Sequence, residues 1–194
     1  MGFPQVTLEL PGWVEELLPD PGGTYPTEED RMRLVVELSR HNVERETGGP
    51  FGAAIFERET GRLLAPGVNL VVASSCSVAH AEMVAIMIAQ QVVGDFDLGS
   101  GGKPAYELYA STEPCAMCFG ATPWSGVRSL LCGARDEDAR AAGFDEGAKP
   151  PDWITALEER GISVERDVLR EDAARVLRDY ANSGGEIYNA CQGD

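Results

Sequence analysis

Apolar residues recur along the chain in two periods, one typical of strands and the other of helices. Residues 51–56 and 62–73 flank a turn at residues 59–61, which predicts a β-hairpin. Further strands are expected at residues 106–111, 129–133 and 162–168. Helices are expected at residues 28–46, 80–93, 115–125, 136–142, 152–160 and 171–181. Since strands and helices alternate, we predict an α/β fold in which helices cover a sheet.

The predicted helix at residues 80–93 is apolar on nearly every face. Its apolar residues include Met83, Val84, Ile86, Ile88 and Val92. A helix that is hydrophobic all round is typical of one enclosed by other elements. We therefore expect this helix to be central and buried.

The first 26 residues differ in composition from the rest of the chain. They are rich in proline and glycine, which predicts an irregular leader with a short amphipathic turn at residues 13–18. No long linker interrupts residues 27–194, so we expect a single domain that ends in a helical tail. A chain of 194 residues is long enough for one domain with a full core.

The charge of the chain disfavours nucleic acid as a partner. There are 32 acidic and 16 basic residues, and the net charge is −16. Such a surface repels a phosphate backbone, and no cluster of lysine and arginine offsets it. No apolar run is long enough to span a membrane, and residues 1–18 lack the basic start of a signal peptide. We expect a cytoplasmic protein.

Two short segments carry the chemistry of a metal site: His80-Ala81-Glu82 and Pro114-Cys115-Ala116-Met117-Cys118. Thiolates three residues apart at a helix start can share one face. With the His80 imidazole they make three protein ligands, which leaves a fourth tetrahedral position for water, as in catalytic zinc sites. The pattern matches the H-x-E…P-C-x-x-C signature of zinc-dependent nucleobase deaminases.

Glu82 is expected to act on protons rather than to bind the metal. Residues two apart on a helix point in nearly opposite directions, so His80 and Glu82 converge only at the helix end. Zinc lowers the pKa of bound water toward about 7, and Glu82 could take that proton and deliver it to the substrate.

Other interpretations of the cysteines stay open. A structural zinc site would need a fourth ligand, which Cys76 or Cys132 could supply. A Cys-x-x-Cys pair can also be redox-active, although such a motif requires no upstream His-x-Glu. The five cysteines include Cys191, and their odd number argues against a disulfide framework.

The stretch from residue 48 to residue 147 resembles the cytidine deaminase superfamily, in the branch of guanine and tRNA adenosine deaminases. Besides the metal segments, the matching pieces are Gly49-Pro50-Phe51-Gly52-Ala53 and Asn69. Ala142-Gly143-Phe144-Asp145-Glu146 is similar to a segment of bacterial guanine deaminases, to which the resemblance is closest. The resemblance implies a three-layer α/β/α sandwich with a five-stranded mixed sheet and one Zn²⁺ per chain. It also implies a homodimer in which one subunit's C-terminal segment caps the other's pocket.

The resemblance also assigns roles to residues around the metal. Phe51 should stack on a ring, and Asn69 should hydrogen-bond a ring nitrogen or carbonyl. Ala81 and Cys115 should present backbone N–H groups to the reacting centre, and Trp124 should form a pocket wall.

Glu146 matches a second carboxylate that recognises the amine side of the base and assists proton transfer. It is one methylene longer than the aspartate of relatives, so Asp145 is the alternative candidate. Cys76-Ser77-Val78-Ala79 departs from the Asp-Pro-Thr-Ala that relatives show, and the loop at residues 94–103 is long. The C-terminal segment around Tyr188 also differs from the aromatic end of guanine deaminases.

We therefore expect a zinc-dependent aminohydrolase that acts on a free aminated heterocycle, guanine or a related purine or triazine. The alternatives are a cytosine or nucleoside deaminase, including one for a biosynthetic nucleoside. A tRNA adenosine deaminase and a non-catalytic zinc module are further alternatives.

Overall fold

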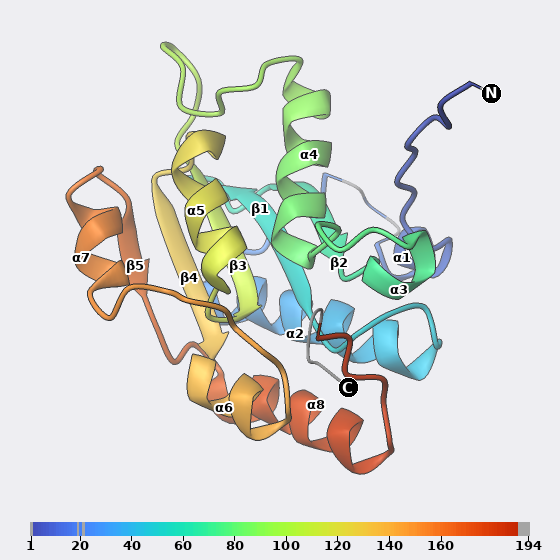
Figure 1. The fold of residues 1–194 in the computed structure, drawn as a ribbon. Coiled ribbons are helices and arrows are strands. Elements are labelled where there is room, and N and C mark those ends of the chain that lie inside the picture. The colour runs from blue at the N-terminus through green and yellow to red at the C-terminus, as the bar shows by residue number, and fades with distance from the viewer. Residues whose placement is uncertain (1, 19, 21, 190–194) are drawn as a thin grey trace.

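A computed structural model describes residues 2–18, 20 and 22–189 of the chain. Its five strands form one sheet in the order β2-β1-β3-β4-β5 (Figure 1). The strands are β1 (Gly52–Glu57), β2 (Leu63–Val68), β3 (Tyr106–Thr112), β4 (Ser129–Ala134) and β5 (Ser163–Glu165). Strand β1 pairs antiparallel with β2 and β3, whereas β3, β4 and β5 run parallel. The predicted five-stranded mixed sheet is confirmed.

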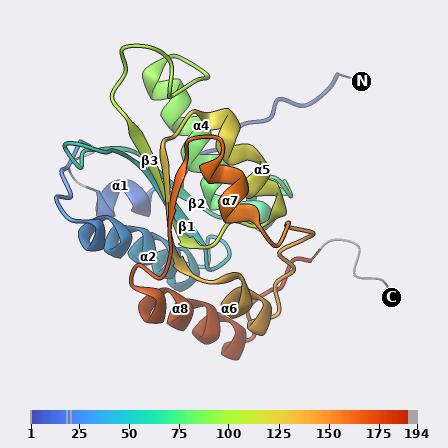
Figure 2. The ribbon, with the colours of Figure 1, turned by 90° about the vertical axis from the view of Figure 1, so that its left-hand side faces the viewer.

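Helices cover both faces of this sheet, as the two ribbon views show (Figures 1 and 2). They are α1 (Trp13–Leu17), α2 (Glu28–Glu44), α3 (Val71–Ser74), α4 (Ala81–Val93), α5 (Ala116–Ser125), α6 (Asp136–Ala141), α7 (Trp153–Glu158) and α8 (Arg170–Asn182). Helices α2 and α8 pack on one face, and α4 and α5 lie on the other. Two apolar clusters, one on each side of the sheet, form the core of this three-layer α/β/α sandwich.

Two strands are shorter than the sequence pattern predicts, because each ends where its partner ends. The predicted strand at residues 62–73 stops at Val68, which pairs with Gly52 at the start of β1, and the chain then turns into α3. Strand β5 has three residues instead of the predicted span 162–168, because it pairs only with residues 129–131 of the neighbouring strand β4.

The prediction of a fully buried helix at residues 80–93 is wrong for its outer side. Helix α4 packs against β1, β2 and α5, which buries residues such as Ala85 and Ala89. Met87 and Val92 point away from these contacts and are exposed. The apolar outer face of α4 is thus left open in the single chain.

The N-terminal segment is partly built into the core. Trp13 and Val14 of α1, together with Leu18, are buried among the residues that surround α2. Before this helix the chain is largely exposed, as at Phe3 and Val6. Among the described residues, no helix is both long and apolar enough to cross a membrane.

Candidate active site

Three side chains meet at the starts of two neighbouring helices. His80 is the residue that precedes α4, Cys115 precedes α5, and Cys118 lies in the first turn of α5. Their possible ligand atoms all lie within 4.8 Å of one another. The Nδ1 atom of His80 is 3.5 Å from the Cys115 sulfur and 3.7 Å from the Cys118 sulfur. The structure thus brings the predicted metal ligands together.

This donor set fits zinc of the catalytic kind. One nitrogen and two sulfurs are ligands that zinc prefers, and three protein ligands leave one tetrahedral position open. In the described part of the chain, neither Cys76 nor Cys132 joins the cluster, so the fourth ligand of a closed structural site is absent. Hydrogen bonds from Cys118 and His80 lower the pKa of Cys115 to about 4, which favours the thiolate that a metal requires.

Glu82 lies beside the ligands without belonging to them. It sits in the first turn of α4, is buried, and lines the same cavity as His80 and Cys115. Burial raises its pKa, and the negative charge of Cys115 raises it further. A carboxyl group that holds a proton more readily than usual is suited to carry protons between water and a substrate.

Glu146 is a second buried carboxyl group on the same cavity. Burial raises its pKa to about 8, with further contributions from Cys115 and Glu82. The Ala116 N–H donates to the Glu146 carbonyl at 2.9 Å, which ties this loop to the start of α5. Two perturbed carboxyl groups in one cavity are typical of a catalytic site.

The cavity also offers an aromatic ring and an amide. Phe51 lines it and packs edge-on against Phe144, with 4.8 Å between the ring centroids. Asn69 is buried, and its Oδ1 accepts from the Val71 N–H at 3.2 Å. Because this bond occupies Oδ1, the Nδ2 group remains as the donor that Asn69 can offer to a bound molecule.

The C-terminal segment covers the cavity of its own chain. Tyr188 lines the cavity and packs against Phe144 at 5.5 Å between centroids. Asn189 accepts from the Asp145 N–H and donates to the Gly143 carbonyl, both at 2.9 Å. The buried Tyr188 hydroxyl has no hydrogen-bond partner within the described residues. The C-terminal segment thus lines the pocket of its own chain, and the cap from a partner subunit stays a prediction.

Trp124 does not reach the cavity, which corrects its predicted place in a pocket wall. It is 83% exposed on α5 and is not among the residues that line the cavity. Six residues separate it from Cys118, and at 3.6 residues per turn this rotates it by about 120° away from the metal side. Asp145 lies at the rim with an exposed side chain. Ala81 is buried as the first residue of α4, where backbone N–H groups lack a partner within the helix.

Sequence reasoning missed a buried charge cluster behind the metal segment. Glu113 is buried, pairs with Arg166, and accepts from the Asp136 N–H at 3.1 Å. Lys149 donates to the Pro114 carbonyl at 2.9 Å and pairs with Asp136 at 3.1 Å. These contacts hold the segment that carries Cys115. The scarcity of lysine, with only Lys103 besides it, was the one signal for Lys149.

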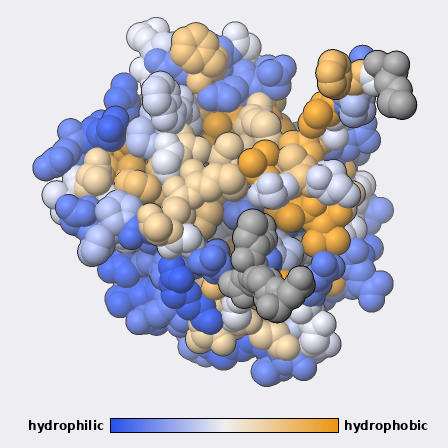
Figure 3. All heavy atoms as spheres, viewed as in Figure 1, coloured by the Kyte–Doolittle hydropathy of each residue, from blue (hydrophilic) through white to orange (hydrophobic). Residues whose placement is uncertain are grey.

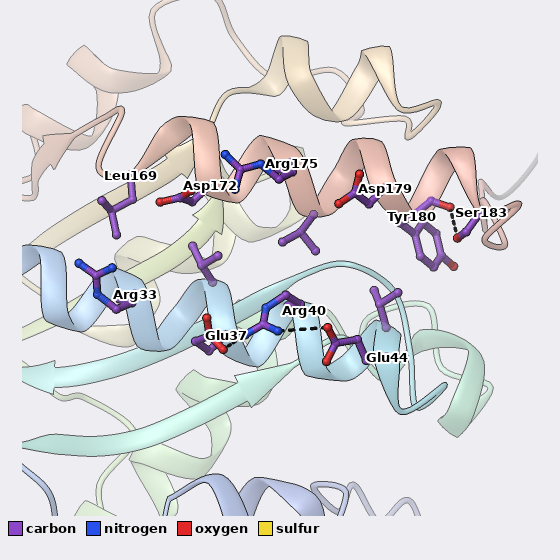
Figure 4. Close-up of a pocket in the computed structure, with 13 residues that line it drawn as sticks. Arg33, Glu37, Arg40, Glu44, Leu169, Asp172, Arg175, Asp179, Tyr180 and Ser183 are labelled. Carbon is purple, nitrogen blue, oxygen red and sulfur yellow. Dashed lines mark hydrogen bonds and ion pairs between the residues drawn. The ribbon is translucent and has the colours of Figure 1, made fainter.

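A larger cavity of about 480 Å³ lies elsewhere, between α2 and α8 (Figure 4). Its charged residues largely pair with one another, as Arg40 does with Glu37 and Glu44. No histidine or cysteine lines it. Its chemistry does not resemble that of a catalytic centre, so the smaller cavity at the metal ligands is the candidate active site.

Fold and site together define a class of protein: a hydrolytic deaminase that depends on zinc. Residues 26–134 match the zinc-binding region of cytidine and deoxycytidylate deaminases. The chain belongs to this family.

Its relatives include guanine deaminases. The guanine deaminase of Bacillus subtilis is 35% identical over 153 residues, which are 78% of this chain and 94% of that protein. A solved structure of guanine deaminase from Nitrosomonas europaea has a TM-score of 0.87 at 46% identity, and the match covers 93% of this chain and 100% of the other. A structure of NE0047 with 2,6-diaminopurine has a TM-score of 0.89 at 47% identity, and the match covers 96% of this chain and 97% of the other. The resemblance to bacterial guanine deaminases is thereby confirmed.

Proposed function

We propose that the chain hydrolyses free guanine to xanthine and ammonia. The observation that carries the proposal is the meeting of one N,S,S ligand set with two buried carboxyl groups, Glu82 and Glu146, in a single cavity. Relatives named guanine deaminases support the choice of base.

The size of the cavity suits a small ligand. Its volume is about 240 Å³. Pockets for drug-sized molecules measure about 300–1,000 Å³, so this smaller space is in the range expected for a small heterocycle.

Each side chain has a place in the reaction. When bound by His80, Cys115 and Cys118, zinc supplies a Lewis acid that makes water nucleophilic near neutral pH. Glu82 takes one proton from the attacking water and delivers it to a ring nitrogen, and it then carries the second proton, from the newly formed hydroxyl group, to the leaving amine. The water oxygen bonds to the ring carbon that carries the exocyclic amine, the carbon–nitrogen bond breaks, and ammonia leaves.

The remaining groups bind and orient the base. Phe51 stacks on the ring, and the Nδ2 group of Asn69 donates to an acceptor of the base. Glu146 faces the exocyclic amine and exchanges a proton with it, which its pKa of about 8 permits near neutral pH. The orphan hydroxyl of Tyr188 gains a partner in the bound base.

The charge of the surface speaks against tRNA as the substrate. An anticodon arm needs a basic approach surface. The net charge of −16 provides the opposite, so a small neutral base is the better match.

We also propose that two copies form a homodimer in the cytoplasm. Apolar-coloured atoms form a band over the face where α4 and α5 lie (Figure 3). Met87 of α4 and Trp124 of α5 are exposed there, and large exposed apolar patches mark interaction surfaces. The described cysteines form no disulfide, which suits a reducing compartment.

The test is ammonia release from a panel of guanine, adenine, cytosine, their nucleosides and aminotriazines, with Glu82→Ala in parallel. Turnover of guanine that depends on Glu82 would support the proposal. Turnover restricted to cytosine, nucleosides or triazines would move the substrate assignment and keep the reaction class. Absence of turnover from zinc-loaded protein would refute the proposal.

A further inference from the structure

Asn42 is a fully buried polar residue in the last turn of α2 and is not among the residues that line the cavity. Its Nδ2 group donates to two backbone carbonyls, those of Gly49 and Asn69, both at 2.9 Å. Its Oδ1 accepts from the Thr47 hydroxyl at 2.8 Å. Both donor hydrogens and the acceptor of this amide are therefore in use.

The two carbonyls belong to the segments that carry Phe51 and Asn69. Phe51 also donates its N–H to the Gly49 carbonyl at 2.8 Å, and the Asn69 N–H donates to the Phe51 carbonyl at 3.1 Å. The Asn42 side chain thus links these two segments through their backbone carbonyls. The approach is so close that a Cβ atom at Gly48 would overlap both the Asn69 carbonyl and the Asn42 amide.

The N-terminal segment supports the acceptor side of the Asn42 amide. The two carbonyls accept only, so they fix the Nδ2 side of the amide and leave Oδ1 in need of a donor. The Thr47 hydroxyl accepts from Trp13 Nε1 at 3.0 Å, and its own hydrogen has two acceptors on Asn42, Oδ1 at 2.8 Å and the backbone carbonyl at 3.3 Å, of which Oδ1 is the nearer. Trp13 belongs to α1, which precedes every cavity-lining residue in the sequence.

We propose that Asn42 is a positioning residue for base recognition, and that Thr47, held by Trp13, keeps its amide in place by bonding Oδ1. This inference rests on the proposed function. Asn42 sets the separation between the Phe51 ring and the Asn69 amide without touching the base. The N-terminal segment thereby contributes to substrate affinity.

The test is steady-state kinetics with guanine, normalised to bound zinc, for Asn42→Ala and for the pair Thr47→Val and Thr47→Ser. Phe51 and Asn69 contact parts of the base that do not react, so their displacement should raise KM about tenfold and change kcat by less than about threefold. Thr47→Val should raise KM, whereas Thr47→Ser, which keeps the hydroxyl, should restore it.

Met32→Ala provides the control for a general loss of stability, because Met32 is fully buried in the same helix α2. It should lower the Tm and leave KM unchanged. Equal KM values for Asn42→Ala and Met32→Ala would overturn the inference. In that case, guanine turnover by the parent chain would still support the proposed function. Absence of guanine turnover by the parent chain would overturn both.

Discussion

Replacing Glu146 by glutamine should make the protein more stable at alkaline pH while it impairs catalysis. Burial raises the pKa of Glu146 to about 8 in the folded chain. In the unfolded chain a glutamate has a pKa of about 4.3. Between these two values the unfolded state releases the proton and the folded state keeps it, so each increase in pH favours unfolding.

The size of this effect follows from the gap between the two pKa values. A gap from about 4.3 to about 8 amounts to about 5 kcal/mol of stability, present below pH 4 and lost above pH 8. Bound zinc is a nearby positive charge that stabilises the carboxylate, so the loss should be smaller in the zinc-loaded protein. Glutamine has nearly the same shape and does not titrate, so Glu146→Gln should not lose stability in this way as the pH rises.

The assay is denaturant unfolding of the parent chain and Glu146→Gln between pH 5 and pH 9, with zinc present and after chelation. The difference in unfolding free energy should grow with pH and level off above pH 8. Asp145→Asn is the matched control, because that neighbouring carboxyl is exposed and should give no such growth. A difference that stays constant over this range would refute the reasoning about the Glu146 site.

Three further predictions concern catalysis, metal binding and assembly. Glu82→Gln should lower kcat by about 10²- to 10⁴-fold while the zinc content stays at one per chain; loss of zinc, measured by metal analysis, would show that Glu82 is a ligand instead. Cys118→Ser should release zinc to a chelator more readily, whereas Cys132→Ser should retain it. Trp124→Asp should shift the sedimentation coefficient from dimer to monomer, and an unchanged coefficient would exclude this face from the interface.

The sequence alone identified the reaction chemistry because that chemistry depends on local spacing. His80, Cys115 and Cys118 start two helices, and a helix start brings side chains two or three residues apart to one point. The start of α2 is local in the same way, because Thr27 and Asp30, three residues apart, form a capping box there. Alternating strands and helices indicated the layered fold.

The second half of the site was beyond the reach of local spacing. Asn42 and Asn69 lie 27 residues apart, and Trp13 and Thr47 lie 34 apart, yet they share hydrogen bonds. Such contacts arise only when α2 packs on the sheet and the loops at its edge close over each other. The sequence contains both partners of each hydrogen bond, but no local pattern predicts that they come into contact.

What the sequence determined by itself was therefore the metal ligands, the alternation of strands and helices, and the acidic charge. The tertiary structure decided that Trp124 faces outward, that Tyr188 covers the cavity of its own chain, and that one face of α4 stays exposed. The physical reason is that the direction of a side chain depends on which neighbours compete for the same space. Packing of the whole chain, and no local pattern, settles that competition.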